Sequence, residues 1–78
     1  MFRAALSLWR QGDDEGALRA CRALLEKRPK HARAWALCAL LENDLASAER
    51  GFELRPDLSA TRSALAQLLT RIDARHVP

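Results

Sequence analysis

The chain has 78 residues and a formal net charge of +3, contains no Tyr and only three Gly and three Pro, and is rich in Ala, Leu and Arg. This length allows a single domain, and this composition favours helix over strand. No apolar run approaches the ~20 residues that a membrane-spanning helix needs, and no nucleophile, base and orienting group can be assembled for catalysis. We therefore expect one all-α domain over residues 1–75 that is not an enzyme.

The positive charge lies in the first half of the chain. Up to Ala39 there are eight Lys or Arg against four Asp or Glu, and after it five against six. A nucleic-acid-binding protein usually has a denser basic stripe with aromatic residues among the cations, so weak nucleic-acid binding is the lesser alternative.

Cys21 and Cys38 lack the close Cys/His spacing of a zinc site. They predict buried free thiols in a reducing cytoplasm, without a metal or cofactor.

The first predicted helix covers residues 2–11 and is apolar over a wide arc. Its two arginines and lack of acids would also suit an organellar presequence, but the helix runs directly into repeat-like sequence, which favours a structural role. Gly12 can adopt the left-handed conformation that ends a helix, and Asp13 or Asp14 can cap the next one. The three consecutive acids at this turn are therefore explained by capping rather than by a metal site.

The second and third predicted helices cover residues 14–28 and 31–42. The second has one apolar face and ends before Pro29, which disfavours helix at the preceding residue. The third is apolar nearly all the way round, which predicts a central helix with neighbours on two sides. In this helix we expect Trp35 to lie in the core, whereas Trp9 in the first helix is the better candidate for a partner contact.

The fourth and fifth predicted helices cover residues 45–54 and 57–74. A turn at Asn43 and Asp44 separates the third and fourth, because Asn tolerates the left-handed conformation and Asp is a good N-cap. One continuous helix through Phe52 is the alternative, since no Gly or Pro intervenes before Gly51. Asp57 or Ser59 can cap the last helix, whose single apolar face would close a helical stack, and residues 76–78 are expected to fray.

A four-residue pattern ends two of these helices, as Glu26-Lys27-Arg28-Pro29 and as Glu53-Leu54-Arg55-Pro56. The segment from Gln11 to Leu18, followed by Leu24 and Pro29, resembles the turn, second helix and terminal proline of a tetratricopeptide repeat. Ala34-Trp35 and the small Ala39 look like the start of a second repeat. The resemblance implies a right-handed α-solenoid of about two helical hairpins and a C-terminal capping helix, five helices in all.

The second repeat is shorter than the family pattern. Pro29 and Pro56 are 27 residues apart, where the family repeats every ~34 residues. The difference corresponds to about two helical turns, so we expect each helix of the second hairpin to lose about one turn. A loss of three or four residues keeps the same face of a helix pointing inward.

The resemblance also implies a concave groove that binds a short peptide or helix of a partner protein. By position, the groove has an apolar floor and basic edges, formed by Phe2, Leu6, Trp9, Arg10, Arg33, Leu37, Leu40, Gln67 and Arg71. The family's clamp for chaperone C-terminal carboxylates is not expected, because the corresponding places hold Phe2, Leu6, Leu37, Ala60 and Ala64. Self-association, or packing within a larger repeat protein, is the structural alternative. No small-molecule substrate is indicated.

The basic connection from Arg28 to Arg33 allows two interpretations. Its Lys, Arg and His side chains could bind a phosphate or an acidic peptide. They could also be simply solvated, since cations at the end of a helix are already favoured by the helix dipole. The sequence favours the solvated loop.

Overall fold

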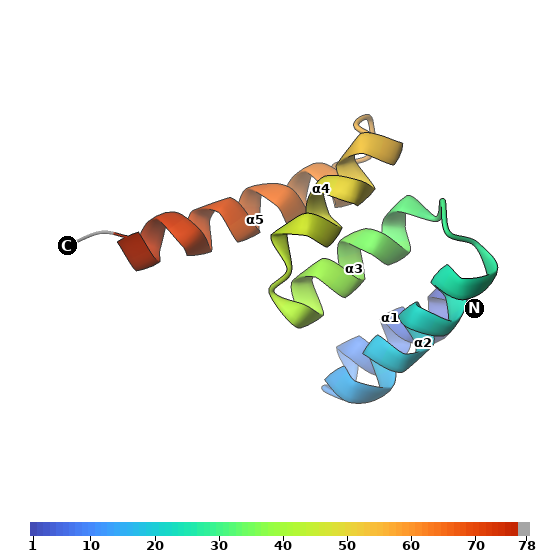
Figure 1. Cartoon of the computed structure of the whole chain (residues 1–78). Helices are drawn as coiled ribbons and strands as arrows, with labels where there is room; N and C mark the ends of the chain where they lie inside the picture. Colours follow the sequence, from blue (N-terminus) through green and yellow to red (C-terminus); the bar gives the residue numbers. More distant parts are fainter. Residues whose placement is uncertain (77–78) are drawn as a thin grey trace.

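The computed structural model describes the backbone of residues 1–76 and the side chains of residues 1–72. This part of the chain contains five α-helices and no strand, which confirms the all-α prediction. The helices are α1 (Phe2–Arg10), α2 (Asp14–Lys27), α3 (Ala32–Glu42), α4 (Leu45–Leu54) and α5 (Ser59–His76) (Figure 1). The last helix begins two residues later than predicted and continues through His76, so the prediction that residues 76–78 fray is wrong for His76, while residues 77–78 lie outside the described residues. No helix in the described part of the chain is both long and apolar enough to cross a bilayer.

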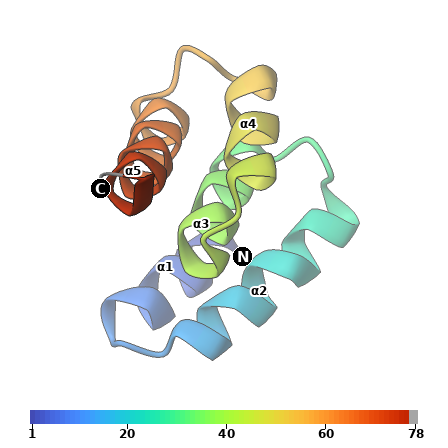
Figure 2. The ribbon, with the colours of Figure 1, turned by 60° about the vertical axis from the view of Figure 1, so that its left-hand side comes forward.

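Consecutive helices run in opposite directions, so that α1, α3 and α5 share one direction (Figure 1). The beginning of α1 and the α2–α3 and α4–α5 connections therefore lie at one end of the molecule. The α1–α2 and α3–α4 turns lie at the other end. Helix α3 occupies the centre, where it packs against α2, α4 and α5, whereas α1 packs mainly on α2 (Figure 2).

The two hairpin turns use the same chemistry. Gly12 has φ +87° and Asn43 has φ +55°, so each places a left-handed residue directly before an Asp. Asp13 accepts a hydrogen bond from the amide of Gly16 at 2.9 Å, and Asp44 accepts one from the amide of Ala46 at 3.1 Å. Each carboxylate thereby satisfies one free amide of a helix start. The predicted turn at Asn43 and Asp44 is confirmed, and the alternative of one continuous helix is wrong.

The two Arg-Pro junctions are stabilised by contacts that the sequence did not reveal. After Pro29, His31 caps α3, because its Nδ1 accepts a hydrogen bond from the amide of Ala34 at 3.1 Å. After the second junction, the buried hydroxyl of Thr61 lies 2.5 Å from the carbonyl oxygen of Arg55 and 3.0 Å from that of Leu58. Thr61 thus ties the start of α5 to the end of α4.

Asp57 does not cap α5 as predicted. Its carboxylate instead accepts two hydrogen bonds from the Arg55 guanidinium, at 2.9 and 2.8 Å. A guanidinium can donate two parallel, charge-assisted hydrogen bonds to one carboxylate, and at Asp57 this pair takes the place of a hydrogen bond to a helix amide. Ser59, the other predicted cap, is the first residue of the helix itself.

The core is built around α3, which contributes to two clusters of buried side chains. One cluster contains Ala5, Cys21, Leu37 and Cys38, and the other contains Ala39, Ala48 and Leu68. Small residues allow close packing of the second hairpin. A Cβ at Gly51 of α4 would lie 3.1 Å from the carbonyl oxygen of Ala32 and 3.2 Å from Cβ of Trp35. Helix α4 therefore packs closely against α3, and a Cβ at this position would require its neighbours to shift by a few tenths of an ångström.

Candidate protein-binding surface

The exposed side of α1 carries a hollow of about 440 Å³. Its lining residues are Arg3, Leu6, Ser7, Arg10 and Gln11. Leu6 is half-buried and packs against the first core cluster, so it is held in place from below. Arg3 and Arg10 flank it, are exposed, and form no ion pair within the described part of the chain. The hollow therefore combines an apolar floor with two guanidinium groups that are available to a partner.

Trp9 extends the apolar part of this surface. Its side chain is 40% exposed, which makes it one of three large hydrophobic residues exposed among those the structure describes. It lies three residues from Leu6, so both project from the same side of α1. Because α1 packs mainly on α2, its other side remains open to solvent, and Arg3, Trp9 and Arg10 are all exposed. We call Arg3, Leu6, Trp9 and Arg10 the α1 face.

The α3 residues of the predicted groove are divided between core and surface. Leu37 is only 4% exposed and belongs to the first core cluster, so its predicted role as a contact anchor is wrong. The physical reason is that α3 is covered by three other helices and has almost no free side. Leu40 is half-buried against the second cluster, whereas Arg33 is exposed at the beginning of the helix.

Phe2 has a supporting position. It is half-buried, and its ring centroid lies 5.1 Å from that of His31, with the two planes tilted by 37°. This contact holds the start of α1 against the α2–α3 connection. Phe2 is therefore better placed to orient α1 than to contact a partner.

The α5 residues of the predicted groove are exposed but make contacts of their own. The guanidinium of Arg71 donates a hydrogen bond to the side-chain oxygen of Asn43 at the α3–α4 turn, and the amide nitrogen of Gln67 donates one to the hydroxyl of Ser63 at 3.2 Å. The structure thus brings Leu6, Trp9 and Arg10 together on α1. It places Arg71 at the α3–α4 turn.

The cysteines carry no reactive site. Burial raises the pKa of Cys21 to about 11 and that of Cys38 to about 12, so both thiols are protonated at neutral pH. The Cys38 thiol also donates a hydrogen bond to the carboxylate of Glu42 at 3.4 Å, and Glu42 pairs with Arg22 across α2 and α3. No group of three or more His, Cys, Asp or Glu that could hold a metal occurs among the described residues.

Two features of the surface were missed by the sequence analysis. Arg3 lines the α1 hollow, and its spacing of seven residues from Arg10 on one helical face was the signal that could have revealed it. Leu54 and Leu58 line a second hollow beside the basic α2–α3 connection. No signal in the sequence could show that these two connections face one another.

The chemistry of these side chains is that of recognition, since they supply apolar area and cationic hydrogen-bond donors. No protein-family model, curated protein or solved structure matches the chain. Among its described side chains, the α1 face joins an exposed indole, a hollow and two arginines without an ion-pair partner.

Proposed function

We propose that this protein is an interaction module of tetratricopeptide-like helical hairpins, stacked as a short right-handed α-solenoid, which binds a short peptide or helix of a partner protein on the α1 face. The observation that carries the proposal is the hollow in which half-buried Leu6 lies between Arg3 and Arg10, beside exposed Trp9. The module acts in the cytoplasm and has no catalytic role, metal or cofactor of its own.

The chemistry of the α1 face defines the partner. Trp and Arg are the residue types that most often dominate binding energy at protein interfaces. An apolar side chain docking over Leu6 and Trp9 would gain about 25 cal/mol per Å² of apolar surface removed from water. Carboxylates on either side of it can accept paired hydrogen bonds from the Arg3 and Arg10 guanidinium groups. The expected partner is therefore an amphipathic segment with Asp or Glu beside its apolar residues.

Binding of a model peptide tests this proposal. A fluorescein-labelled amphipathic peptide of Leu, Ala and Glu should bind in an anisotropy titration, and the matched peptide with Lys in place of Glu should bind more weakly. Arg10→Ala and Trp9→Ala should each weaken binding of the acidic peptide by about tenfold, or ~1.4 kcal/mol. Arg19→Ala is the control, because Arg19 is exposed on α2 and belongs to none of the ion pairs that the structure describes.

Two results of this titration would refute the proposal. One is equal affinity for the acidic and the basic peptide, and the other is an equal loss in Arg19→Ala and Arg10→Ala. Circular dichroism of each variant must show the helical content of the unmodified protein, so that the loss of affinity reports on the surface.

A structural role in a larger assembly is the second candidate, and α5 favours it. Leu69 is 45% exposed on this helix, next to the exposed Ala66 and Thr70. In a longer repeat array, such a face would pack against another hairpin, and in an isolated domain it would favour self-association. Sedimentation over a dilution series tests this role, because Leu69→Glu should abolish any association that the unmodified protein shows.

A further inference from the structure

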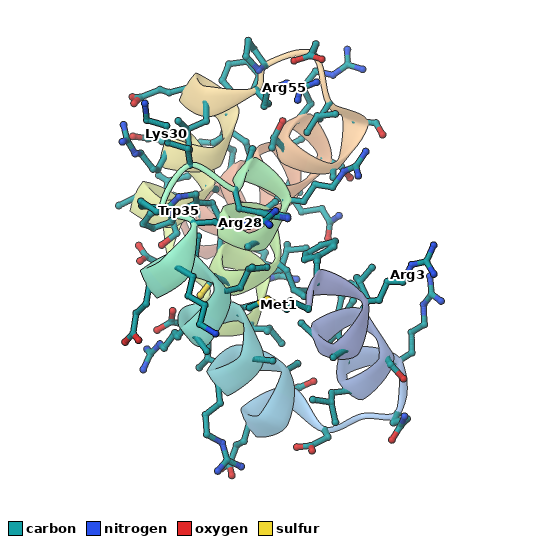
Figure 3. The ribbon with its side chains drawn as sticks, turned by 90° about the vertical axis from the view of Figure 1, so that its right-hand side faces the viewer. Met1, Arg3, Arg28, Lys30, Trp35 and Arg55 are labelled. Atoms are coloured by element: carbon teal, nitrogen blue, oxygen red, sulfur yellow. The ribbon has the colours of Figure 1, made fainter. Side chains whose placement is uncertain are left out.

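A second hollow, of about 380 Å³, lies where the α2–α3 and α4–α5 connections meet. Its lining residues are Lys30, His31, Ala32, Arg33, Leu54, Arg55 and Leu58. Figure 3 looks onto this end of the molecule and shows Arg28, Lys30 and Arg55 there. The two Arg-Pro junctions that repeat in the sequence thus border one surface. We call it the junction hollow.

The rim of the junction hollow is basic and largely unneutralised. Lys30 and Arg33 are exposed and form no ion pair within the described part of the chain. Arg55 is already paired with Asp57 at 2.8 Å, and its hydrogen bonds hold the pKa of that carboxyl at about 2. No acidic residue lines the hollow, nor the adjoining hollow of about 430 Å³ that Arg28, Pro29, Lys30 and His31 form. An anionic group would therefore meet Lys30 and Arg33 without displacing an acid from either.

The floor of the junction hollow is aliphatic. Leu54 and Leu58 are half-buried, and Ala32 is 5% exposed. His31 is fixed beside them, because its Nδ1 accepts the Ala34 amide and its ring lies against Phe2. In the neutral imidazole this hydrogen bond places the proton on Nε2, which makes that nitrogen a donor. Cationic rim and aliphatic floor together suit a ligand that is acidic and apolar at neighbouring positions.

We propose that the junction hollow docks an acidic segment of a partner protein in which Asp or Glu residues flank a leucine-like side chain. The carboxylates meet Lys30 and Arg33, and the apolar side chain lies on Leu54 and Leu58. This surface is separate from the α1 face and does not depend on it. A protein segment fits better than single-stranded nucleic acid, which needs aromatic platforms for its bases. The one aromatic residue that lines the hollow, His31, already packs against Phe2.

The probe for this proposal is a short labelled peptide of Asp and Glu residues around a central Leu, titrated into the whole protein. Arg33→Glu should weaken its binding by about tenfold, because the variant replaces an attraction with a repulsion. The variant should fold, since an acid in the first turn of α3 is favoured by the helix dipole. Arg19→Glu makes the same change in net charge away from the hollow and should alter affinity by no more than about twofold. Replacing the central Leu of the peptide with Ser should also weaken binding.

Amide chemical-shift changes in a ¹⁵N-labelled sample locate the peptide. The proposal predicts changes at residues 30–33 and at Leu54, Arg55, Asp57 and Leu58, since Pro56 has no amide proton. Changes confined to α1 would overturn it while leaving the α1 face supported. Tighter binding of single-stranded RNA, with the same residues shifted, would assign the hollow to nucleic acid and overturn the proposal. Sedimentation of the unliganded protein that depends on concentration, and is abolished by Arg33→Glu, would assign the hollow to a second copy of the chain and overturn it likewise.

Discussion

The two helical hairpins share one plan but differ in how much of each is covered. Both turn through a left-handed residue followed by an Asp cap, and both end at an Arg-Pro junction. The helices of the second hairpin, α3 and α4, have 11 and 10 residues, and their small side chains bring them close together under α5. The first hairpin keeps a longer α2, of 14 residues, and leaves the α1 face open.

We propose that the second hairpin contributes most of the stability and that the first hairpin offers the recognition surface. Helix α3 packs against three other helices, and six of its residues are buried. Helix α1 contributes less to the core, since Ala5 is its one buried residue. Substitutions that lower either the free energy of unfolding or the affinity for a peptide, but not both, can therefore test this difference between the hairpins.

The largest effect is expected at Leu37. Leu37→Ala removes a core side chain that is 4% exposed, and it should lower the free energy of unfolding by about 3 kcal/mol in urea denaturation. Leu6→Ala, which alters a half-buried residue of the α1 face, should lower it by about half as much and should also weaken peptide binding. Equal losses of stability at the two positions would contradict the division between the hairpins.

Gly51 should give the next largest effect. Gly51→Ala places a Cβ 3.1 Å from the Ala32 carbonyl oxygen and 3.2 Å from Cβ of Trp35, so it should destabilise the protein by about 1 to 3 kcal/mol despite the better helix propensity of Ala. Ala46→Leu is the control, because Ala46 is exposed on the same helix and the change should be nearly neutral. A stabilised Gly51→Ala protein, by thermal unfolding, would show that α4 does not pack closely on α3.

The two turns offer a direct comparison. Gly12→Ala and Asn43→Ala each force an alanine into a positive φ, and each should cost about 1 kcal/mol in urea denaturation. Asn43→Gly restores the backbone freedom but removes the acceptor of Arg71, so it should fall between Asn43→Ala and the unmodified protein. Both variants of Asn43 lose the Arg71 contact, so an Asn43→Gly protein no more stable than Asn43→Ala would show that the left-handed backbone at residue 43 does not cost alanine stability.

The two buried cysteines join the hairpins, and their titration should give the smallest effect near neutral pH. Burial raises the pKa of Cys21 to about 11 and that of Cys38 to about 12, from an ordinary value of 9.0. Above pH ~9 the unfolded chain loses these protons before the folded chain does. The contribution of the two thiols to the free energy of unfolding is therefore complete below that pH and falls as pH rises toward 11 to 12. Urea midpoints should therefore drop between about pH 9 and pH 11. In Cys21→Ala/Cys38→Ala this pH dependence should be smaller, and an unchanged slope would refute the assignment.

Local chemistry made the helices and turns predictable from the sequence. Asn43 before Asp44 can form the same turn as Gly12 before Asp13, and Pro29 and Pro56 mark the other boundaries. The same local reasoning identified Trp9 as exposed, and its side chain is 40% exposed. Trp35, which was expected in the core, is only half-buried, because its indole N–H donates a hydrogen bond to the carbonyl oxygen of Pro29 at the edge of the α2–α3 connection.

The positions that depend on tertiary packing could not be predicted. The sequence of a helix that is apolar nearly all round does not show which of its leucines other helices will bury. Leu37 was therefore assigned to the groove although it lies in the core. The hydroxyl of Thr61 bonds two carbonyl groups of a connection whose path is set by packing. The junction hollow likewise exists only because two connections that are far apart in the sequence meet at one end of the fold.

The affinity of the acidic amphipathic peptide for Trp9→Ala tests the central claim most directly. We expect binding to weaken by about tenfold while the variant stays folded, since the exposed 40% of the Trp9 side chain is free to contact a partner. Unchanged affinity in this variant, with the fold intact, would contradict the assignment of recognition to the first hairpin.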